Sequence, residues 1–354
     1  MTIHRGSLCV SGKLASFLTG YLAPRQAQVV VDSAASKPMP LTNTVFQGTV
    51  LGPPLWNTFF ADVASVLTAH GATEAKYADD LNMYKAYAGQ TPCDDILADL
   101  KHLQSATHSW GRANQVIFDG AKEEFAIIHR RHNHGDAFKL LGIWIDTKLT
   151  MDVAVDKVVK KISPKVTALL RTRRFHSQAA LLAQYKSHIL CHLDRCGGAV
   201  FHASDTVLLP LDRVQGRFLR ELGLSAADAF LQYNLAPVAM RRDIGILGLI
   251  HKCVVGVADI TLRELFPAAE QRCHGHDTRL SSRRHNKQVL DRCDGRHSEL
   301  LARSIFGLVK VHNLLPQHMV DHTGVTAFQH TLTLHAKHVC KSGVHDWHRV
   351  FSRC

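Results

Sequence analysis

The sequence predicts an α+β fold, and three observations support this class. Up to about residue 146, apolar residues repeat with helical spacing in some segments and with strand-like alternation in others. These segments follow the order helix, strand, helix, hairpin, helix, strand, strand, which is typical of an antiparallel sheet with helices on one face. From about residue 147 the spacing is helical. We therefore expect a sheet domain followed by a mainly helical region.

Each expected element of the sheet domain has its own signal. Two apolar stripes keep the i, i+3, i+4 spacing of a helix, and Pro53 and Pro54 suit the first turn of the second one. Alternation of apolar and polar residues predicts a hairpin in "KYADDLNMY" (76–84). In chain order, the sequence predicts a helix at 14–22, a strand at 28–32, a helix at 55–67, a hairpin at 76–84, a helix at 94–110, and strands at 123–129 and 139–146.

A basic segment opens the helical region. Residues 157–174 contain seven basic residues and no acidic one, and their apolar residues keep helical spacing, although Pro164 is expected to kink or break the helix. Such a face offers sequence-independent contacts to the phosphates of a nucleic-acid duplex, whereas the plain alternative is a solvated helix face. The residues expected to contact the nucleic-acid backbone are Lys157, Lys160, Lys161, Lys165, Arg171, Arg173 and Arg174.

The composition limits the classes of partner and the cellular compartment that we expect for this protein. The 354 residues carry 42 Lys and Arg against 30 Asp and Glu, a formal charge of +12 that favours polyanions such as nucleic acid, with ordinary solubility charge as the alternative. Nine scattered cysteines are typical of a reduced intracellular protein. We find no signal-peptide pattern and no apolar run of about 18 residues, so we expect no membrane partner. An intracellular location, in the nucleus or the cytoplasm, is expected, without a clear targeting signal.

Two adjacent carboxylates, Asp79 and Asp80, interrupt the alternating stretch at 76–84. Asp is a poor strand former, and adjacent negative charges repel each other. A carboxylate pair on a tight hairpin suits a hard cation such as Mg²⁺, which takes one or two carboxylates and completes its shell with phosphate oxygens. The alternative is a polar turn in which both side chains are only hydrated.

Four segments occur in an order that bears on this choice: "QGTVLGPPLW" (47–56), "YADD" (77–80), "NQVIFDGAKEEF" (114–125) and "FKLLGIWID" (138–146). Together they resemble the palm of reverse transcriptases, most closely those of non-LTR (LINE-type) retrotransposons, and the resemblance extends over roughly residues 6–260. It implies RNA-directed DNA polymerisation by two-metal nucleotidyl transfer, with Mg²⁺ or Mn²⁺ as cofactor and with an RNA template and a DNA primer as partners.

The resemblance also implies roles for individual residues and regions. Asp79 and Asp80 match the catalytic, metal-binding pair, and Lys122 matches a lysine that assists the departure of pyrophosphate. The residues placed beside the nucleotide and the template are Gln47, Gly48, Tyr77 and Ala78. The implied regions are a partial palm over 1–146, a basic helical thumb and connection over 147–235, and a His-rich basic C-terminal extension over 236–354.

The resemblance is incomplete at its upstream end. Residues 1–31 contain no Asp or Glu, so the aspartate motif and the fingers of the family have no counterpart, and the chain resembles an N-terminally truncated reverse transcriptase. Charge stabilisation by correctly held metals supplies most of the catalysis, so we expect this chain not to polymerise DNA by itself. Two alternatives stay open: a non-catalytic remnant that grips primer–template duplex through its basic thumb, and a decayed reading frame whose product does not fold stably.

Cysteine and histidine lie close in sequence at 191–196, 272–277 and 340–354. Their spacing departs from the common structural zinc patterns. Ordinary surface His and buried Cys are therefore favoured, and zinc is not expected.

Overall fold

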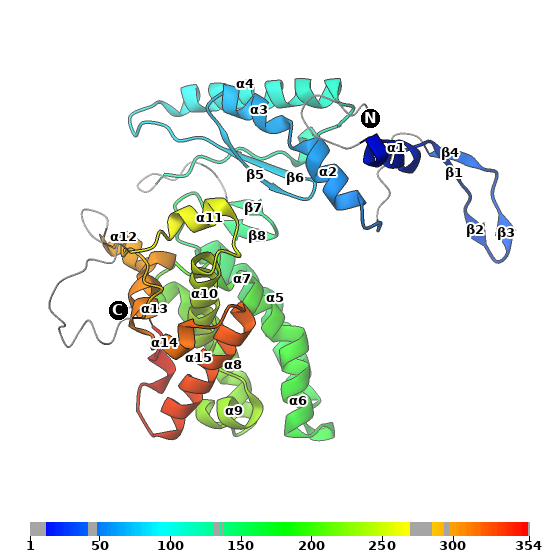
Figure 1. The fold of residues 1–354 in the computed structure, drawn as a ribbon. Coiled ribbons are helices and arrows are strands. Elements are labelled where there is room, and N and C mark those ends of the chain that lie inside the picture. The colour runs from blue at the N-terminus through cyan, green and yellow to red at the C-terminus, as the bar shows by residue number, and fades with distance from the viewer. Residues whose placement is uncertain are drawn as a thin grey trace. The chain divides into compact units, whose positions relative to one another are not determined.

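The computed structural model describes residues 12–41, 48–129, 135, 137–269, 285–293 and 298–352. The chain separates into two compact units, Met1–Phe125 and Ala126–Cys354. Figure 1 traces both along the chain. The palm expected over 1–146 therefore includes a stretch, 126–146, that the structure groups with the second unit.

The first unit combines helices with small antiparallel sheets, each of two strands. Helix α1 precedes an arm in which β1 pairs with β4 and β2 with β3, and the hairpin β5–β6 follows later. Its elements are α1 (Gly12–Tyr21), β1 (Arg25–Ala27), β2 (Val30–Val31), β3 (Ala34–Ala35), β4 (Met39–Leu41), α2 (Gly52–Phe60), α3 (Val63–Ala69), β5 (Thr73–Tyr77), β6 (Asp80–Tyr84), α4 (Cys93–Ala113) and the 3-10 turn η1 (Gly120–Lys122).

Helices α3 and α4 cover one face of the β5–β6 hairpin (Figure 1). Successive side chains of a strand point to opposite faces. Leu81 and Met83 of β6 therefore point the same way, and they pack against the buried Leu67 of α3 and Leu103 of α4. This arrangement confirms the predicted α+β class, with helices packed on one face of the hairpin.

Several predicted elements of the first unit are confirmed. The structure has helices at the stretches expected at 14–22 and 94–110, and it has the hairpin expected at 76–84. The helix expected at 55–67 is present as two, α2 and α3, with Pro at the first positions of α2. The strand expected at 28–32 is confirmed only at Val30–Val31.

Two strand predictions are wrong. Residues 123–129 form no strand, although His129 N donates a hydrogen bond of 2.9 Å to Thr147 O. The segment 139–146 is a hairpin instead of a single strand, since Leu141 and Gly142 adopt φ of 47° and 82°. Positive φ at both central residues is the signature of a type I′ turn, which reverses the chain.

The second unit is mainly helical, as expected. After the small hairpin the described elements are helices and helical turns, and none of these helices combines the length and the apolar character of a membrane span. The elements are β7 (Phe138–Leu140), β8 (Ile143–Ile145), α5 (Asp152–Arg171), η2 (Arg173–Phe175), α6 (Gln178–Tyr185), the π-helix η3 (Lys186–Leu190), α7 (Cys191–Gly197), α8 (Asp205–Glu221), α9 (Ala226–Tyr233), α10 (Val238–Val254), α11 (Ile260–Leu265), α12 (Ser298–Arg303), η5 (Ile305–Leu308), α13 (Val309–Leu314), α14 (Gln317–Val320), α15 (Val325–Lys341) and η6 (Trp347–Arg349).

Two apolar clusters hold the second unit together. The first joins α5 to α8 and contains a stacked pair, Tyr185 and Phe218, with ring centroids 4.4 Å apart. The second joins α10 to α15 around Phe328.

Of the kink or break expected at Pro164, the break does not occur, because α5 runs through this residue. Pro164 lies on the exposed side of α5, where water can satisfy the Lys160 carbonyl that loses its helical partner. Ile162 and Val166 anchor the opposite side in the core.

Three histidines are buried in the second cluster: His251, His285 and His312. His251 stacks on Phe328 at a centroid distance of 4.0 Å, and its Nε2 lies 2.7 Å from the carbonyl of His322. Burial lowers the pKa of His251 and His285 and lowers the pKa of His312 to about 3. The folded protein therefore keeps these imidazoles neutral where an unfolded chain would protonate them.

We expect the stability of the second unit to fall as the pH drops below about 6.5. Below this pH the unfolded chain binds a proton at position 312, whereas in the folded chain His312 stays neutral down to its pKa of about 3. Each histidine that behaves in this way lowers the free energy of unfolding by about 1.4 kcal/mol per pH unit. Urea unfolding at pH 7.5, 6.0 and 5.0 measures this loss. His312→Leu should show a shallower loss than the wild type, by about one proton, whereas the exposed His330→Gln should not differ from it. An unchanged slope in His312→Leu would contradict the explanation.

Candidate nucleic-acid interface

The segment "YADD" (77–80) forms the tight turn of the β5–β6 hairpin. Tyr77 pairs with Asp80 across the ladder, and Ala78 and Asp79 are the two turn residues between them. Ala78 has a φ of 55°. Primed hairpin turns require positive φ at this first turn position, where glycine is the usual residue. A non-glycine residue held there costs about 1–3 kcal/mol, so its surroundings must fix the turn.

The turn is held by the indole of Trp56 in α2. Trp56 Nε1 donates a hydrogen bond of 2.9 Å to the carbonyl of Ala78. The Trp56 ring stacks on Phe60, with centroids 5.2 Å apart, and Phe60 meets Trp110 of α4 edge-on at 5.7 Å. The sequence predicted Trp56 as part of an apolar helical stripe and as the end of the segment 47–56, without a role at the turn. The available signal was that a partly buried indole N–H needs an acceptor.

Two of the four segments that carry the resemblance contribute residues to this aromatic core, and a third, the turn, is hydrogen-bonded to it through Trp56. Trp56 comes from 47–56, the turn comes from 77–80, and Val116 and Phe118 come from 114–125. Packing around Phe60 thus brings together stretches that are up to about 70 residues apart in sequence. The fourth segment, 138–146, belongs to the second unit.

Asp79 and Asp80 are both exposed. Asp80 lies on the hairpin face opposite Leu81, away from the face that α3 and α4 cover. Two adjacent hydrated carboxylates fit Mg²⁺ or Mn²⁺ when water and phosphate oxygens complete the shell. The described residues contain no group of three or more His, Cys, Asp or Glu side chains that could hold a metal ion.

The other predicted site residues of the first unit are spread around the hairpin. Gln47 lies outside the described residues, and Gly48 sits in a turn at a φ of 82° with open space around it. Lys122 is exposed and pairs with Asp119 at 3.0 Å; this pair raises the pKa of Lys122 and lowers that of Asp119. In the described part of the chain, no hydrogen bond or ion pair joins Gly48 or Lys122 to residues 77–80.

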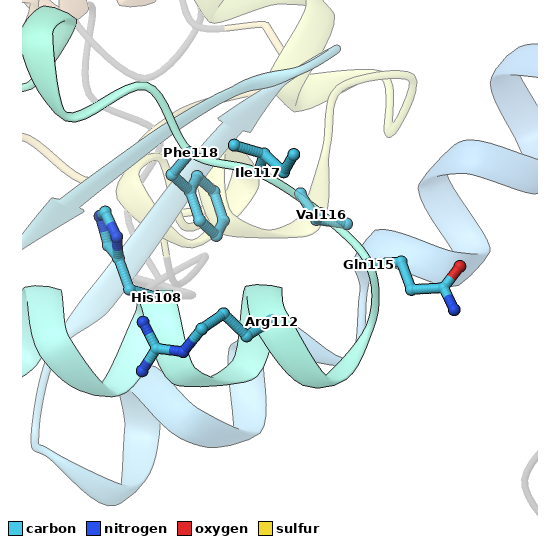
Figure 2. A pocket seen from close by; sticks show the side chains of 6 residues that line it. All are labelled: His108, Arg112, Gln115, Val116, Ile117 and Phe118. Carbon is cyan, nitrogen blue, oxygen red and sulfur yellow. The ribbon is translucent and has the colours of Figure 1, made fainter.

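A pocket of about 300 Å³ lies at the end of α4 (Figure 2). It is lined by His108 and Arg112 of the helix and by residues 115–118 of the segment that follows. The chain can reverse so closely because Gly111 has no side chain: a Cβ there would lie 2.7 Å from the carbonyl of Val116. None of the predicted site residues lines this pocket.

In the second unit, helix α5 carries most of the predicted basic residues. The buried side of α5 carries Ile162, Val166 and Leu169. Five basic residues of α5 are exposed: Lys157, Lys160, Lys161, Lys165 and Arg171. At 100° per residue, Lys157, Lys160 and Arg171 lie opposite the buried side, and Lys161 and Lys165 lie toward one edge of it. We call these five residues the basic stripe.

The members of this stripe differ in their partners. Lys157 lies 5.3 Å from the ring centre of Trp144, and Lys160 pairs with Asp156 at 2.8 Å. Beyond the helix, the exposed Arg173 pairs with Glu221 at 3.1 Å, and Arg174 lies over the ring of Phe175 at 4.8 Å. These two arginines are therefore engaged locally.

Two residues of α7, His192 and Arg195, extend the stripe, and the sequence did not predict a role in nucleic-acid binding for either of them. Lys165 Nζ donates to His192 Nε2 at 2.8 Å, and Arg195 donates to the carbonyl of Leu141 in the β7–β8 turn at 3.1 Å. Burial, and then the nearby charges of Lys165, Lys161 and Arg195, lower the pKa of His192. Sequence alone carried no signal for this neighbourhood, because only packing brings α7 beside α5.

Of the Cys and His segments considered for zinc, only 191–196 lies wholly within the described residues. Cys191 is exposed and bonds to the carbonyl of Ser187, whereas Cys196 is buried. The segment 272–277 lies outside the described residues, as does Cys354.

Comparison of the chain with protein-family models, with curated proteins and with solved structures found no match. Function is therefore argued from the residues and their geometry.

We expect Gly142→Ala to destabilise the second unit by about 1–2 kcal/mol, because alanine is strained at positive φ and its Cβ would lie 2.7 Å from the guanidinium of Arg195. Gly198→Ala is the matched control, since Gly198 has a helical φ of −67° and nothing within 4 Å of its Cβ position. It should leave the protein unchanged or slightly stabilised. Urea unfolding of both variants measures the difference, and equal effects would contradict the role of the turn.

Proposed function

We propose that the chain is part of an RNA-directed DNA polymerase of the non-LTR retrotransposon type, with the β5–β6 hairpin as its metal-binding element. One observation carries the proposal: the segments 47–56 and 114–125 share one aromatic core, and the acidic turn at 77–80 is hydrogen-bonded to Trp56 of that core.

The geometry suggests how the chain's own groups would act. Asp79 and Asp80 would hold a divalent cation, which would lower the pKa of a primer 3′-hydroxyl and neutralise the leaving pyrophosphate. Trp56 fixes the turn, so the two carboxylates keep their spacing without reorganisation. Lys122 would approach the pyrophosphate only after parting from Asp119, at little cost because the pair is exposed.

We expect Asp79→Asn/Asp80→Asn to weaken Mn²⁺ binding roughly tenfold or more, because two anionic ligands are lost. The matched control is Asp94→Asn/Asp95→Asn, which removes an equally exposed adjacent pair from the first turn of α4. Water-proton relaxation measures the binding of Mn²⁺ by each variant. Bound Mn²⁺ should also broaden the resonances of the primer's 3′-terminal nucleotide in an RNA–DNA primer–template. Equal Mn²⁺ binding by both variants would contradict the metal site.

A second candidate function is duplex binding without chemistry, and the exposed basic stripe of α5 favours it. Within 4 Å, the described residues place no carboxylate against Lys161, Lys165 or Arg171. These cations are therefore available to phosphates, and such contacts release counterions and make the affinity fall with salt.

We expect Lys161→Ala/Lys165→Ala/Arg171→Ala to reduce the slope of log affinity against log salt by about two to three, because each lost phosphate contact removes about 0.9. Arg213→Ala/Arg217→Ala/Arg220→Ala removes the same charge from exposed positions on α8 and serves as the control. Fluorescence anisotropy with a labelled primer–template measures both slopes. If the α8 variant loses as much, binding depends on net charge and not on the stripe.

A further inference from the structure

We propose that Lys161, Lys165, His192 and Arg195 form a proton-linked binding site for one phosphate group of a nucleic-acid backbone. The proposal rests on the duplex-binding function just described, and it adds α7 and a titrating imidazole to that surface. It concerns residues of the second unit alone.

The contact between α5 and α7 sets the starting protonation state. Lys165 can only donate a hydrogen bond, so its 2.8 Å contact uses the lone pair of His192 Nε2. His192 is therefore neutral in this arrangement, with its proton on Nδ1. Lys161 lies one turn before Lys165 on the same exposed sector.

Arg195 is held beside this pair by the β7–β8 turn. Its guanidinium donates to the carbonyl of Leu141 at 3.1 Å and lies 2.7 Å from the position that a Cβ at residue 142 would take. A single carbonyl leaves most of the guanidinium donors available to another acceptor. The turn thus orients a cation on α7 toward the same surface.

The cluster has no compensating carboxylate among the described residues. Asp194 follows His192 closely in sequence, but it is committed to Arg241 by two hydrogen bonds of 2.9 and 2.5 Å. The charged and titratable groups around the imidazole are Lys161 and Lys165 from α5, Arg195 and Asp194 from α7, and the exposed His188 one turn earlier. Three cations with no anion between them make an electrostatic site for an oxyanion.

A bound phosphate would favour the protonated form of His192 over the neutral form. Burial and the surrounding cations disfavour its protonation in the unliganded protein, and a bound anion offsets both effects, so its pKa rises on binding. Once His192 Nε2 is protonated, it can no longer accept the hydrogen bond from Lys165. Both groups can then donate to the phosphate, and complex formation takes up one proton.

The surroundings favour a polymer of phosphates over a single headgroup. The basic stripe continues on both sides of the site, from Lys157 to Arg171, which is about 20 Å at 1.5 Å per residue. A nucleic-acid backbone supplies a row of phosphates on that scale.

The test measures the affinity for a labelled RNA–DNA primer–template between pH 5.5 and 7.5 at constant ionic strength. Linkage sets the sign: the complex binds more protons than the unliganded protein between the two pKa values of His192, so affinity rises as pH falls through that window. The wild type should gain up to about tenfold more per pH unit than His192→Gln. His330→Gln, which removes an exposed histidine from α15, should behave like the wild type.

The imidazole resonances of His192 give a second readout that a purely structural role would not move. Its pKa should rise when duplex is added, and also when inorganic phosphate is added at high concentration. Equal pH dependence in the wild type and His192→Gln, with intact binding, would overturn the proposal but leave duplex binding in place. Absence of duplex binding in the wild type would overturn the underlying function. The same His192-dependent gain with phosphatidylserine vesicles or polyglutamate would overturn the assignment to nucleic acid.

Discussion

The positive φ of Ala78 is the constraint on which the candidate metal site depends. A two-residue turn places Asp79 and Asp80 side by side at the tip of a hairpin, and that turn needs a conformation that alanine disfavours. Trp56 satisfies the turn carbonyl from α2, and the stacked Phe60 ties that indole to α4. The helices of the first unit thus determine where the two carboxylates lie.

In the second unit, too, apolar packing determines where charged side chains lie. The apolar residues of α5 pack into the first core cluster, so its basic residues are exposed to water. The β7–β8 hairpin, with Trp144 beneath Lys157 and Leu141 bonded to Arg195, borders that basic surface and fixes two of its cations. Contacts with neighbouring groups therefore hold these exposed cations in place, unlike solubilising lysines that extend freely into water.

Sequence patterns correctly predicted the elements that depend on the spacing of nearby residues. The hairpin at 76–84, the helix at 94–110 and the sidedness of α5 followed from periodicity alone. The strand expected at 123–129 failed because a strand needs a partner, which periodicity does not reveal. The segment 139–146 was misjudged because the turn depends on two backbone angles at Leu141 and Gly142, and only the glycine hinted at them. Pro164 was tolerated because its exposed position lets water replace the lost hydrogen bond.

The candidate sites were foreseeable where they consist of charged residues adjacent in sequence, as in Asp79 and Asp80. They were not foreseeable where tertiary packing joins distant residues. Trp56 reaches the turn from 22 positions away, and His192 meets Lys165 from 27. Lys122 illustrates the converse, since its partner is the nearby Asp119 and not the hairpin.

The β5–β6 sheet has only two strands in the described part of the chain, so the outer backbone groups of each strand have no ladder partner there. An open edge of this kind can add a strand from another molecule, and charged side chains are a common protection against it. Glu74 and Lys76 on β5 and Asp80 on β6 supply such charges, whereas Tyr77 and Tyr84 are exposed and apolar enough to adhere. Salt screens charge, so concentrated salt would promote self-association through these edges, whereas it would weaken the nucleic-acid binding proposed for α5.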